Sequence, residues 1–523
     1  MKRKAIRIGF IIIFFLLAAC ARQEGPREFS VAIESFPSNL DPRFPNDAYS
    51  SKLQQLLFNG LLKYDDELRL VPDLAERYEY RSSTRIRLKL RPGITFHDGR
   101  PLTTRDVLYT YKTLMDPKKR SPLYETFKKI TEIEPIDDLS LEIEMAEPFA
   151  PFLTALTAGI VPYGVDEESP VRFALRPVGT GPFRWDGYRS DQWIRLKANA
   201  EYFDGPPVLP GLVFKTIRDD TTRVLQLLRG EVDLVQNAVP LIMAQWMREK
   251  AKLAMESDVG INYAYLAFNL RDPSLQDRRV REAIARAIDR DKLIEFRLKG
   301  FARKATGILA PSNWFYEGNV SQYPYDPDGA KLLLDEAGFK DPDGKGPLPR
   351  LTLSLKTSNK RDRVAMARAI ADQLKQVGID LQIRPYEWGT FYRDIKTGNF
   401  QMYSSTWVGV TEPDIYYYAF HSSQVPPNGA NRGYYSNPEV DRLVEEGRRE
   451  TVSSVRKNVY NQVQKIISHD LPYVSLWYED NVVFMRPEVR GYQLRPDASL
   501  EGLVRTSLQN IEGEKAALSP PPL

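Results

Sequence analysis

Residues 88–114 read LKLRPGITFHDGRPLTTRDVLYTYKTL, and the stretch combines turn signals with a well-marked helix start. A short strand is expected at Ile94–Phe96. Two turn-forming pairs flank it: Pro92-Gly93 and Asp98-Gly99. Thr103 and Asp106 have the spacing of a capping box, which predicts a helix immediately afterwards. The apolar residues expected on one face of that helix are Val107, Tyr111 and Leu114.

Residues 351–383 predict a β-α-β unit. Apolar residues alternate with period two in two runs, as in half-buried strands: Leu351, Leu353 and Leu355, then Ile379, Leu381 and Ile383. Between the runs, apolar residues recur at helical spacing: Val364, Ala367, Ala371 and Leu374. Gly378 is positioned to end this helix. Because strands joined through a helix are usually parallel, the pattern predicts an α/β fold.

Three more helices have sequence signals. Asp326-Pro327 can begin a helix that Gly338 ends. Ser436 and Glu439 have capping-box spacing ahead of another helix. An apolar stripe marks the third: Val280, Ile284 and Ile288. The polar and then proline-rich residues 512–523 predict a disordered tail.

Length and composition predict a globular chain of two or three lobes. At 523 residues the chain is too long for one hydrophobic core. Its 42% hydrophobic and 27% charged residues exclude intrinsic disorder of the whole chain.

The N-terminus has the pattern of a lipoprotein signal peptide. Four basic residues precede an uncharged apolar run, Ile8–Ala19, that is short for a membrane span. Small residues then precede Cys20, which resembles a lipobox and predicts removal of residues 1–19 and lipidation of Cys20. The alternative is a chance cysteine after a signal peptide. The mature chain is expected in the cell envelope, anchored by lipid on the extracytoplasmic (periplasmic) side of a bacterial membrane.

Charge and cysteine content exclude several classes of partner. Without residues 1–19 the basic count is 73 − 4 = 69, which equals the 69 acidic residues. A binder of nucleic acid or of anionic membranes would normally show a basic excess. Cys20 is the only cysteine in the sequence, so no intramolecular disulfide and no cysteine-based metal site is expected. No cofactor or metal is predicted.

Motifs for catalysis are not found in the sequence. It contains no G-x-S-x-G, Walker A or H-E-x-x-H pattern. The three histidines, His97, His421 and His469, are interpreted as structural. A hydrolase that uses two carboxylates stays open, because 69 acidic residues supply many pairs.

Five segments in order resemble the extracellular solute-binding proteins of ABC importers, specifically the oligopeptide/dipeptide-binding family (family 5). They cover the chain from about residue 30 to residue 480. The segments begin NLDPRFPND at Asn39, LKLRPGITFHDG at Leu88, GTGPFRWDG at Gly179, FKTIRDDTT at Phe214 and YLAFNL at Tyr265.

The resemblance implies an α/β, periplasmic-binding-protein-like two-lobe fold (type II, the large cluster with an extra inserted subdomain). Lobe I would comprise residues 20–50, 169–268 and 478–523, with the tail at its end and the insertion at 51–168. Lobe II would comprise 269–477, with chain crossings near 268 and 478 as the hinge. The implied function is capture of peptides, or a related small solute, for membrane permease subunits, by a monomer that performs no covalent chemistry.

The family's ligand-binding positions are only partly matched. Relatives commonly bind the ligand α-amine with an aspartate at the position that reads Val410 here. Glu412 is the candidate replacement, and Asp414 either joins it or caps the following segment. Near the position of a carboxylate-binding arginine in dipeptide binders stand Lys356-Thr357, with Arg361 and Arg363 further on. This departs from ordinary dipeptide binding.

Further candidates to contact ligand come from the same region, each with core packing or a structural role as the alternative. They are Trp407, Tyr403, Trp388 and Asn269. Tyr416–Tyr418 cannot all face one side, so at least one is expected in the core. Two other functions remain possible from the sequence: a sensor on the same scaffold without import, and a secreted hydrolase.

Overall fold

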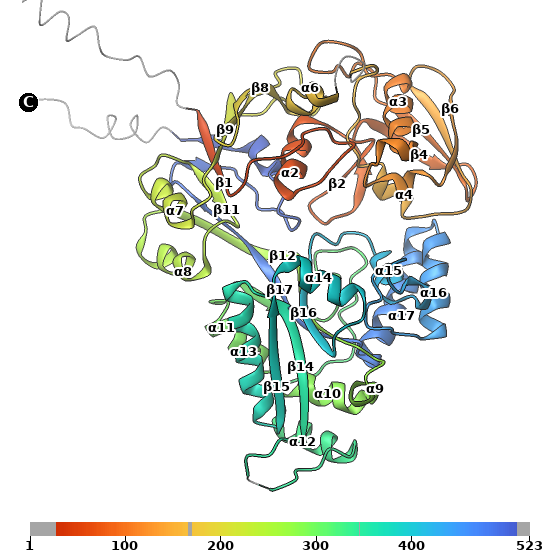
Figure 1. The fold of residues 1–523 in the computed structure, drawn as a ribbon. Coiled ribbons are helices and arrows are strands. Elements are labelled where there is room, and N and C mark those ends of the chain that lie inside the picture. Colours follow the sequence, from red (N-terminus) through yellow and green to blue (C-terminus); the bar gives the residue numbers. More distant parts are fainter. Residues whose placement is uncertain (1–27, 166–169, 345, 510–523) are drawn as a thin grey trace, which may run out of the picture.

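The computed structural model describes residues 28–165, 170–344 and 346–509. The expected signal peptide, Cys20 and the C-terminal tail lie outside these residues. The described chain folds into two lobes, drawn one above the other in Figure 1. We call the body that contains β1 and β8–β11 lobe I, and the body that contains β14–β16 lobe II.

One sheet of eleven strands extends through both lobes of the described chain. In sheet order its strands are β15 (Ile379–Tyr386), β14 (Leu351–Ser358), β16 (Met402–Trp407), β12 (Ala254–Phe268), β17 (Tyr473–Met485), β11 (Leu234–Gln236), β1 (Phe29–Ile33), β10 (Gly211–Thr216), β9 (Trp193–Ala198) and β8 (Phe183–Arg189), with β13 (Ala302–Lys304) paired to β17. The long strands β12 and β17 lie at its centre and pass between the lobes (Figure 1).

The antiparallel pairing of β12 with β17 is interrupted where the strands change lobe. The register shifts between Val259 and Asn262. Before the shift β17 also pairs with β11 of lobe I, and after it β12 pairs with β16 of lobe II. A Cβ on Gly260 would lie 2.6 Å from the carbonyl oxygen of Glu479, so only glycine allows this approach. The lobe boundaries expected near residues 268 and 478 remain predictions.

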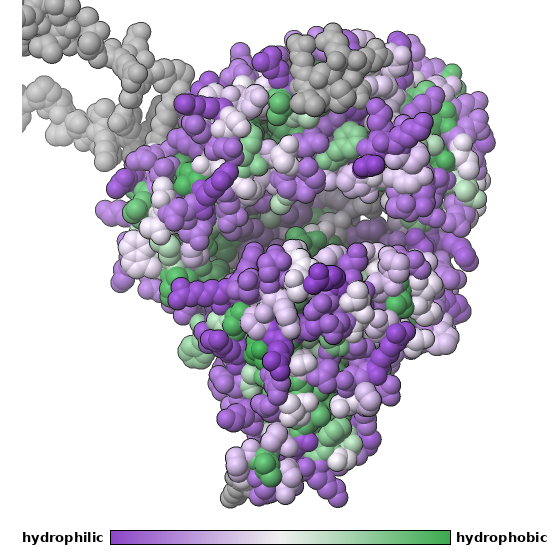
Figure 2. All heavy atoms as spheres, in the orientation of Figure 1, coloured by the Kyte–Doolittle hydropathy of each residue, from purple (hydrophilic) through white to green (hydrophobic). Residues whose placement is uncertain are grey.

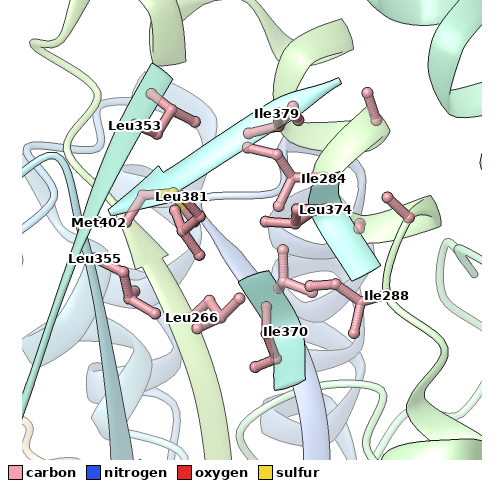
Figure 3. Packing of buried hydrophobic residues seen from close by; sticks show 14 of the residues in the cluster. Leu266, Ile284, Ile288, Leu353, Leu355, Ile370, Leu374, Ile379, Leu381 and Met402 are labelled. Atoms are coloured by element: carbon pink, nitrogen blue, oxygen red, sulfur yellow. The ribbon is translucent and has the colours of Figure 1, made fainter. Parts of the chain in front are cut away.

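The β-α-β unit expected in lobe II is present. Strands β14 and β15 pair in parallel, and α13 (Arg361–Lys375) connects them. Figure 3 shows Leu353 and Leu355 of β14 packed with Ile370 and Leu374 of α13 in one buried cluster. The two period-two runs are confirmed, since their residues lie in or against this cluster, whereas on α13 Ile370, outside the expected stripe, is buried and Val364 is only half-buried.

The remaining helices of lobe II surround the sheet. They are α9 (Pro273–Gln276), α10 (Arg278–Arg286), α11 (Arg290–Phe296), α12 (Pro327–Glu336), α14 (Trp388–Lys396), α15 (Ile415–Phe420), η2 (Ser422–Gln424), α16 (Pro438–Arg449) and α17 (Ser453–Asp470). The start expected at Asp326 is confirmed, since its side chain accepts from the N–H of Gly329. The capping box at Ser436 is wrong. Asn437 caps α16 instead, because Pro438 occupies the first helical position.

Lobe I combines its part of the large sheet with short helices. These elements are α2 (Ala48–Leu57), α6 (Pro170–Leu175), α7 (Asp220–Leu228), α8 (Leu241–Lys250), η3 (Glu501–Arg505) and the pair β18 (Val489–Arg490) and β19 (Ser507–Leu508). Two buried clusters form its core, one on each face of the sheet around β1.

A second sheet with its own core lies beside lobe I (Figure 1). Its strand order is β4 (Ala75–Tyr80), β5 (Arg85–Leu90), β7 (Ser140–Met145), β6 (Ile130–Pro135). The neighbouring elements are β2 (Leu62–Tyr64), β3 (Leu70–Pro72), α3 (Thr104–Met115), η1 (Pro117–Lys119), α4 (Tyr124–Phe127) and α5 (Phe152–Ala155). Its buried residues all fall between Leu61 and Ile160, so this segment forms a compact unit within lobe I.

The stretch at residues 88–114 joins this unit to the rest of lobe I. Thr103 and Asp106 form the expected capping box of α3. The strand expected at Ile94–Phe96 is reduced to an isolated bridge. The ring of His97 contacts the backbone of Gly181 at 3.0 Å and accepts from the N–H of Gly179 at 3.2 Å, and burial lowers its pKa to about 4. His97 is thus a structural residue.

Within the described residues, no helix has the length and apolar character required to cross a membrane.

Truncation of a core side chain in Figure 3 tests the packing of lobe II. Leu355→Ala removes a fully buried side chain, and we expect it to lower the free energy of unfolding by about 2–5 kcal/mol, as measured by urea titration. Leu332→Ala on α12 is the matched control, since this leucine is 63% exposed and its loss should change stability by less than about 0.5 kcal/mol. Equal effects of the two substitutions would contradict the packing described.

Candidate ligand-binding cleft

Two cavities lie between the lobes, and Figure 2 shows the surface hollowed there. The insert-side cavity has a volume of about 470 Å³, and its charged and cross-lobe lining residues are Lys63, Tyr64, Asp73, Thr154, Glu412, Asp414, Asp497 and Glu501. The hinge-side cavity has a volume of about 680 Å³, and its polar lining includes Glu34, Asp220, Asn237, Asn262, Arg297, Asp362, Arg363, Glu479 and Asp480. Both sizes are typical of ligand pockets.

The loop that connects β16 to α15 brings lobe II into the cleft. Strand β16 ends at Trp407, and Gly409 then adopts a φ of 67°, which turns the chain. The N–H of Gly409 donates to the side chain of Asn262 at 3.2 Å, which fixes the loop to the central strand β12. Val408 is 73% exposed, whereas Val410 is buried in the lobe II core.

Glu412 lines the insert-side cavity, where both of its carboxylate oxygens have partners. One oxygen forms a short ion pair with Arg456 of α17, whose side chain is 8% exposed. The other oxygen accepts a hydrogen bond from Thr154 of lobe I at 3.0 Å. Glu412 therefore joins the lobes directly, and its charge is balanced from within lobe II.

Asp414 lies beside Glu412 and is also paired. Its Oδ1 is 2.9 Å from Nε of Arg448, whose guanidinium stacks 3.7 Å above the ring of Tyr417. Burial raises the pKa of Asp414 to about 6, against the opposing charge of Arg448. Its side chain makes no capping hydrogen bond to α15, so the ion pair, rather than a helix cap, is its structural role.

Other contacts cross the cleft near Glu412. The hydroxyl of Thr411 donates to the hydroxyl of Tyr64 at 3.0 Å, and the N–H of Ala150 donates to the carbonyl of Arg448 at 2.7 Å. Leu68 of the β2–β3 hairpin packs in a lobe II cluster. The lobes are therefore in direct contact across the insert side of the cleft.

Trp407 lies behind the cleft in an aromatic cluster. Its ring stacks on Tyr265 with centroids 6.3 Å apart, and the guanidinium of Arg432 lies 5.5 Å above it. The indole N–H is buried and has no hydrogen-bond partner in the structure. Trp407 is not among the lining residues of either cavity.

The other aromatic and amide candidates also lie outside the two cavities. Tyr403 is fully buried among Phe391 and Phe400. Trp388 is 56% exposed at the start of α14. The side chain of Asn269 is used structurally, since it donates to the carbonyl oxygens of Gly398 and Phe400. Tyr416 is buried, as expected for at least one of the three consecutive tyrosines.

The basic candidates are divided between the core and the cleft. Lys356 is buried in an ion pair with Asp394 at 2.7 Å. Arg363 lines the hinge-side cavity and lies 3.3 Å from Glu479 of β17. Arg361 is exposed at the start of α13.

Several lining residues were missed from the sequence: Tyr64, Asp73, Thr154, Asp497 and Glu501. They come from the compact unit within residues 61–160 and from the segment after β17, and no local pattern distinguishes them from other polar residues. Among the described residues, no group of three or more histidines, cysteines or carboxylates could hold a metal ion.

Comparison with known proteins agrees with this architecture. The oligopeptide-binding protein AppA of Bacillus subtilis is 28% identical over 484 residues, which cover 89% of this chain and 88% of AppA. A probable di/tripeptide-binding protein of Pseudomonas aeruginosa is 28% identical over 526 residues, which cover 94% of this chain and 98% of that protein. The solved structure of Bacillus subtilis AppA with a nonapeptide superposes with a TM-score of 0.73 at 26% identity, over 92% of this chain and 99% of AppA.

The family assignment rests on a match to most of the chain. The sequence profile described as bacterial extracellular solute-binding proteins, family 5 Middle, matches residues 69–428, which include most of the second sheet's unit, the central strand β12 and the loop that carries Glu412. The chain therefore belongs to the family 5 bacterial extracellular solute-binding proteins.

Proposed function

We propose that this protein is the peptide-binding component of an ABC importer, which captures a peptide between its lobes and presents it to membrane permease subunits. The observation that carries the proposal is the cleft itself, with cavities lined from both lobes in a chain of this family. Two relatives, named as oligopeptide- and di/tripeptide-binding proteins, support a peptide as the ligand. The proposed role is binding and delivery, with no covalent chemistry.

Ligand capture would proceed by closure of the lobes about β12 and β17. The register shift at Val259–Asn262 is the proposed hinge, because there the pairing is interrupted and the two strands pass between lobes. On β12 the proposed crossing lies six to nine residues before residue 268, the position expected by resemblance. A ligand that contacts both lobes favours the closed population, which is the form the permease would recognise.

The loop between β16 and α15 supplies the proposed contact for the ligand amine. Glu412 is the candidate, since Val410 at the expected position is buried and apolar. To bind an amine, Glu412 would keep its ion pair with Arg456 and exchange the hydrogen bond from Thr154 for one from the ligand. Charge-assisted hydrogen bonds of this kind are strong when desolvated.

A lipid on Cys20 is the proposed anchor of the mature chain, with the lobes outside the cytoplasmic membrane. This residue precedes the described part of the chain, and the proposal rests on the sequence around it. The protein is proposed to act as a monomer, because both cavities are complete within one chain.

The binding proposal predicts a stoichiometric peptide complex. Purified residues 21–523 incubated with a pool of tri- to nonapeptides should retain one peptide per chain in native mass spectrometry, and the peptide should be recovered intact. Failure to retain any peptide would contradict peptide capture, and recovery of cleaved fragments would favour a hydrolase.

Cross-cleft hydrogen bonds are made only when the lobes are together, so their loss should weaken ligand binding. We expect Tyr64→Phe, which removes the hydrogen bond from Thr411, to lower peptide affinity by about 2- to 10-fold in calorimetric titration, at about 0.5–1.5 kcal/mol per bond. Small-angle scattering should show a more open ligand-free chain. Thr131→Val, which removes a hydrogen bond on the exposed face of β6, is the control. Unchanged affinity of the Tyr64→Phe variant would exclude this contact from closure.

Blocking the ligand amine tests Glu412 separately from its structural role. Glu412→Gln should weaken binding of a free-amine peptide by about 10-fold or more, and should leave binding of the N-acetylated peptide unchanged. The melting temperature should fall, since buried Arg456 loses its ion pair. Glu446→Gln, an exposed glutamate of α16 paired with Arg442, is the control. Equal losses for both peptides would mean that Glu412 is structural and does not bind the amine.

A further inference from the structure

We propose that the ligand is a peptide with a basic side chain, and that Asp73, Asp497 and Glu501 of lobe I bind its ammonium or guanidinium group in the insert-side cavity. The inference rests on the proposed function and specifies its substrate class. It concerns the lobe I wall of the cavity, opposite Glu412.

The lining of the cleft is acidic, although the chain is not. The insert-side cavity is lined by five carboxylates and by Lys63 as its basic residue. The hinge-side cavity is lined by five carboxylates and by Arg297 and Arg363. Without the expected signal peptide, basic and acidic residues are equal in number, 73 − 4 = 69 against 69. The negative charge is therefore a property of the cleft and not of the composition.

The carboxylates of the two lobes differ in how their charge is balanced. In lobe II, Glu412 and Asp414 each have an arginine of their own. In lobe I, five carboxylates share two cations: Asp73 and Asp204 share Lys63, and Asp66, Asp497 and Glu501 share Arg495. Lys52 acts on Asp497 from further away. Among the described residues, the lobe I wall therefore has a deficit of positive charge.

The contacts of Arg495 show why it does not neutralise the wall. Its Nη1 lies 2.7 Å from Asp66, and its Nη2 donates to the carbonyl oxygens of Tyr64 and Asp65. Nε is left 3.4 Å from Glu501 and 3.8 Å from Asp497. The guanidinium is thus directed mainly at the β2–β3 hairpin.

Two of the wall carboxyls are largely buried and have only a shared cation beside them. Burial raises the pKa of Glu501 to about 7. Burial likewise raises the pKa of Asp73, whose side chain is 3% exposed and whose Oδ1 accepts no hydrogen bond. An added ammonium group would donate hydrogen bonds and supply the missing charge.

An organic cation suits this wall better than a metal ion. Within the described chain, no cluster of potential metal ligands is present. The cavity of about 470 Å³ has room for a long side chain whose aliphatic part contacts apolar residues such as Phe58 and Phe149. Lysine and arginine combine these two features.

The test compares peptides that differ in a single charge. Three series of pentaalanine derivatives, with Lys, Gln or Glu at each position in turn, are titrated at pH 8 and low salt, where Glu501 is ionised. The best Lys peptide should bind about 10-fold tighter than its Gln counterpart, and the Glu peptide should bind most weakly. Equal affinities would overturn this inference while leaving peptide capture intact. Failure of all three series to bind would count against the proposed function itself.

Substitution of the wall tests the assigned residues. Asp497→Asn combined with Glu501→Gln should reduce the preference for Lys over Gln to less than about 2-fold. Arg495 keeps Asp66 and two carbonyl partners, so the melting temperature should change little. Glu132→Gln, on exposed β6, should retain the full preference. A preference that survives in the double variant would exclude this wall, and the wild-type peptide series decides the substrate class even if the variant does not fold.

Discussion

The rest of the structure depends on the antiparallel pairing of β12 with β17. These strands carry the sheet of lobe I into lobe II, and every other strand of the large sheet is attached to them directly or through intervening strands. The pairing is interrupted at Val259–Asn262, where Gly260 lies against the backbone of Glu479, and it shifts once more between Ala264 and Tyr265. Two rigid bodies joined by a locally weakened ribbon can move relative to each other without loss of either core.

Hydrophobic periodicity and capping residues correctly predicted the helices and strands that depend mainly on neighbouring residues in the sequence. Strands β14 and β15 and helix α13 could be predicted because each has a clear period over a short stretch, and the start of α3 could be predicted from its capping box.

The candidate ligand-binding site was harder to predict from the sequence. The hydroxyls of Tyr64 and Thr411 form a hydrogen bond although 347 residues separate them in the sequence, and no local sequence pattern indicates such a contact. Strand β12 is buried on both faces from Tyr263 to Phe268, so it lacks the alternation that marks a half-buried strand. Glu412 and Asp414, which the sequence predicted to contact ligand, line the insert-side cavity, and their binding role stays a prediction. Trp407, Tyr403 and Asn269 are used for packing and loop structure.

The two sides of the cleft carry similar residues in different electrostatic states. Arginines of α16 and α17 complete the acidic loop of lobe II, so that lobe is balanced whether or not the cleft is occupied. The lobe I wall relies on cations that are shared with the β2–β3 hairpin and with Asp204. A buried carboxylate that shares its cation with other groups has a high affinity for any further cation that can reach it, because burial has already removed most of its hydrating water.

The position of the chain ends has a consequence for orientation. Both ends of the described chain, near β1 and β19, leave lobe I on the same side (Figure 1), and lobe II is entered and left through β12 and β17 alone. A tether at the N-terminus would therefore hold lobe I as the stationary base. Lobe II would then be the lobe that moves relative to the membrane. The N-terminal segment between the membrane and lobe I would not change its length during this movement.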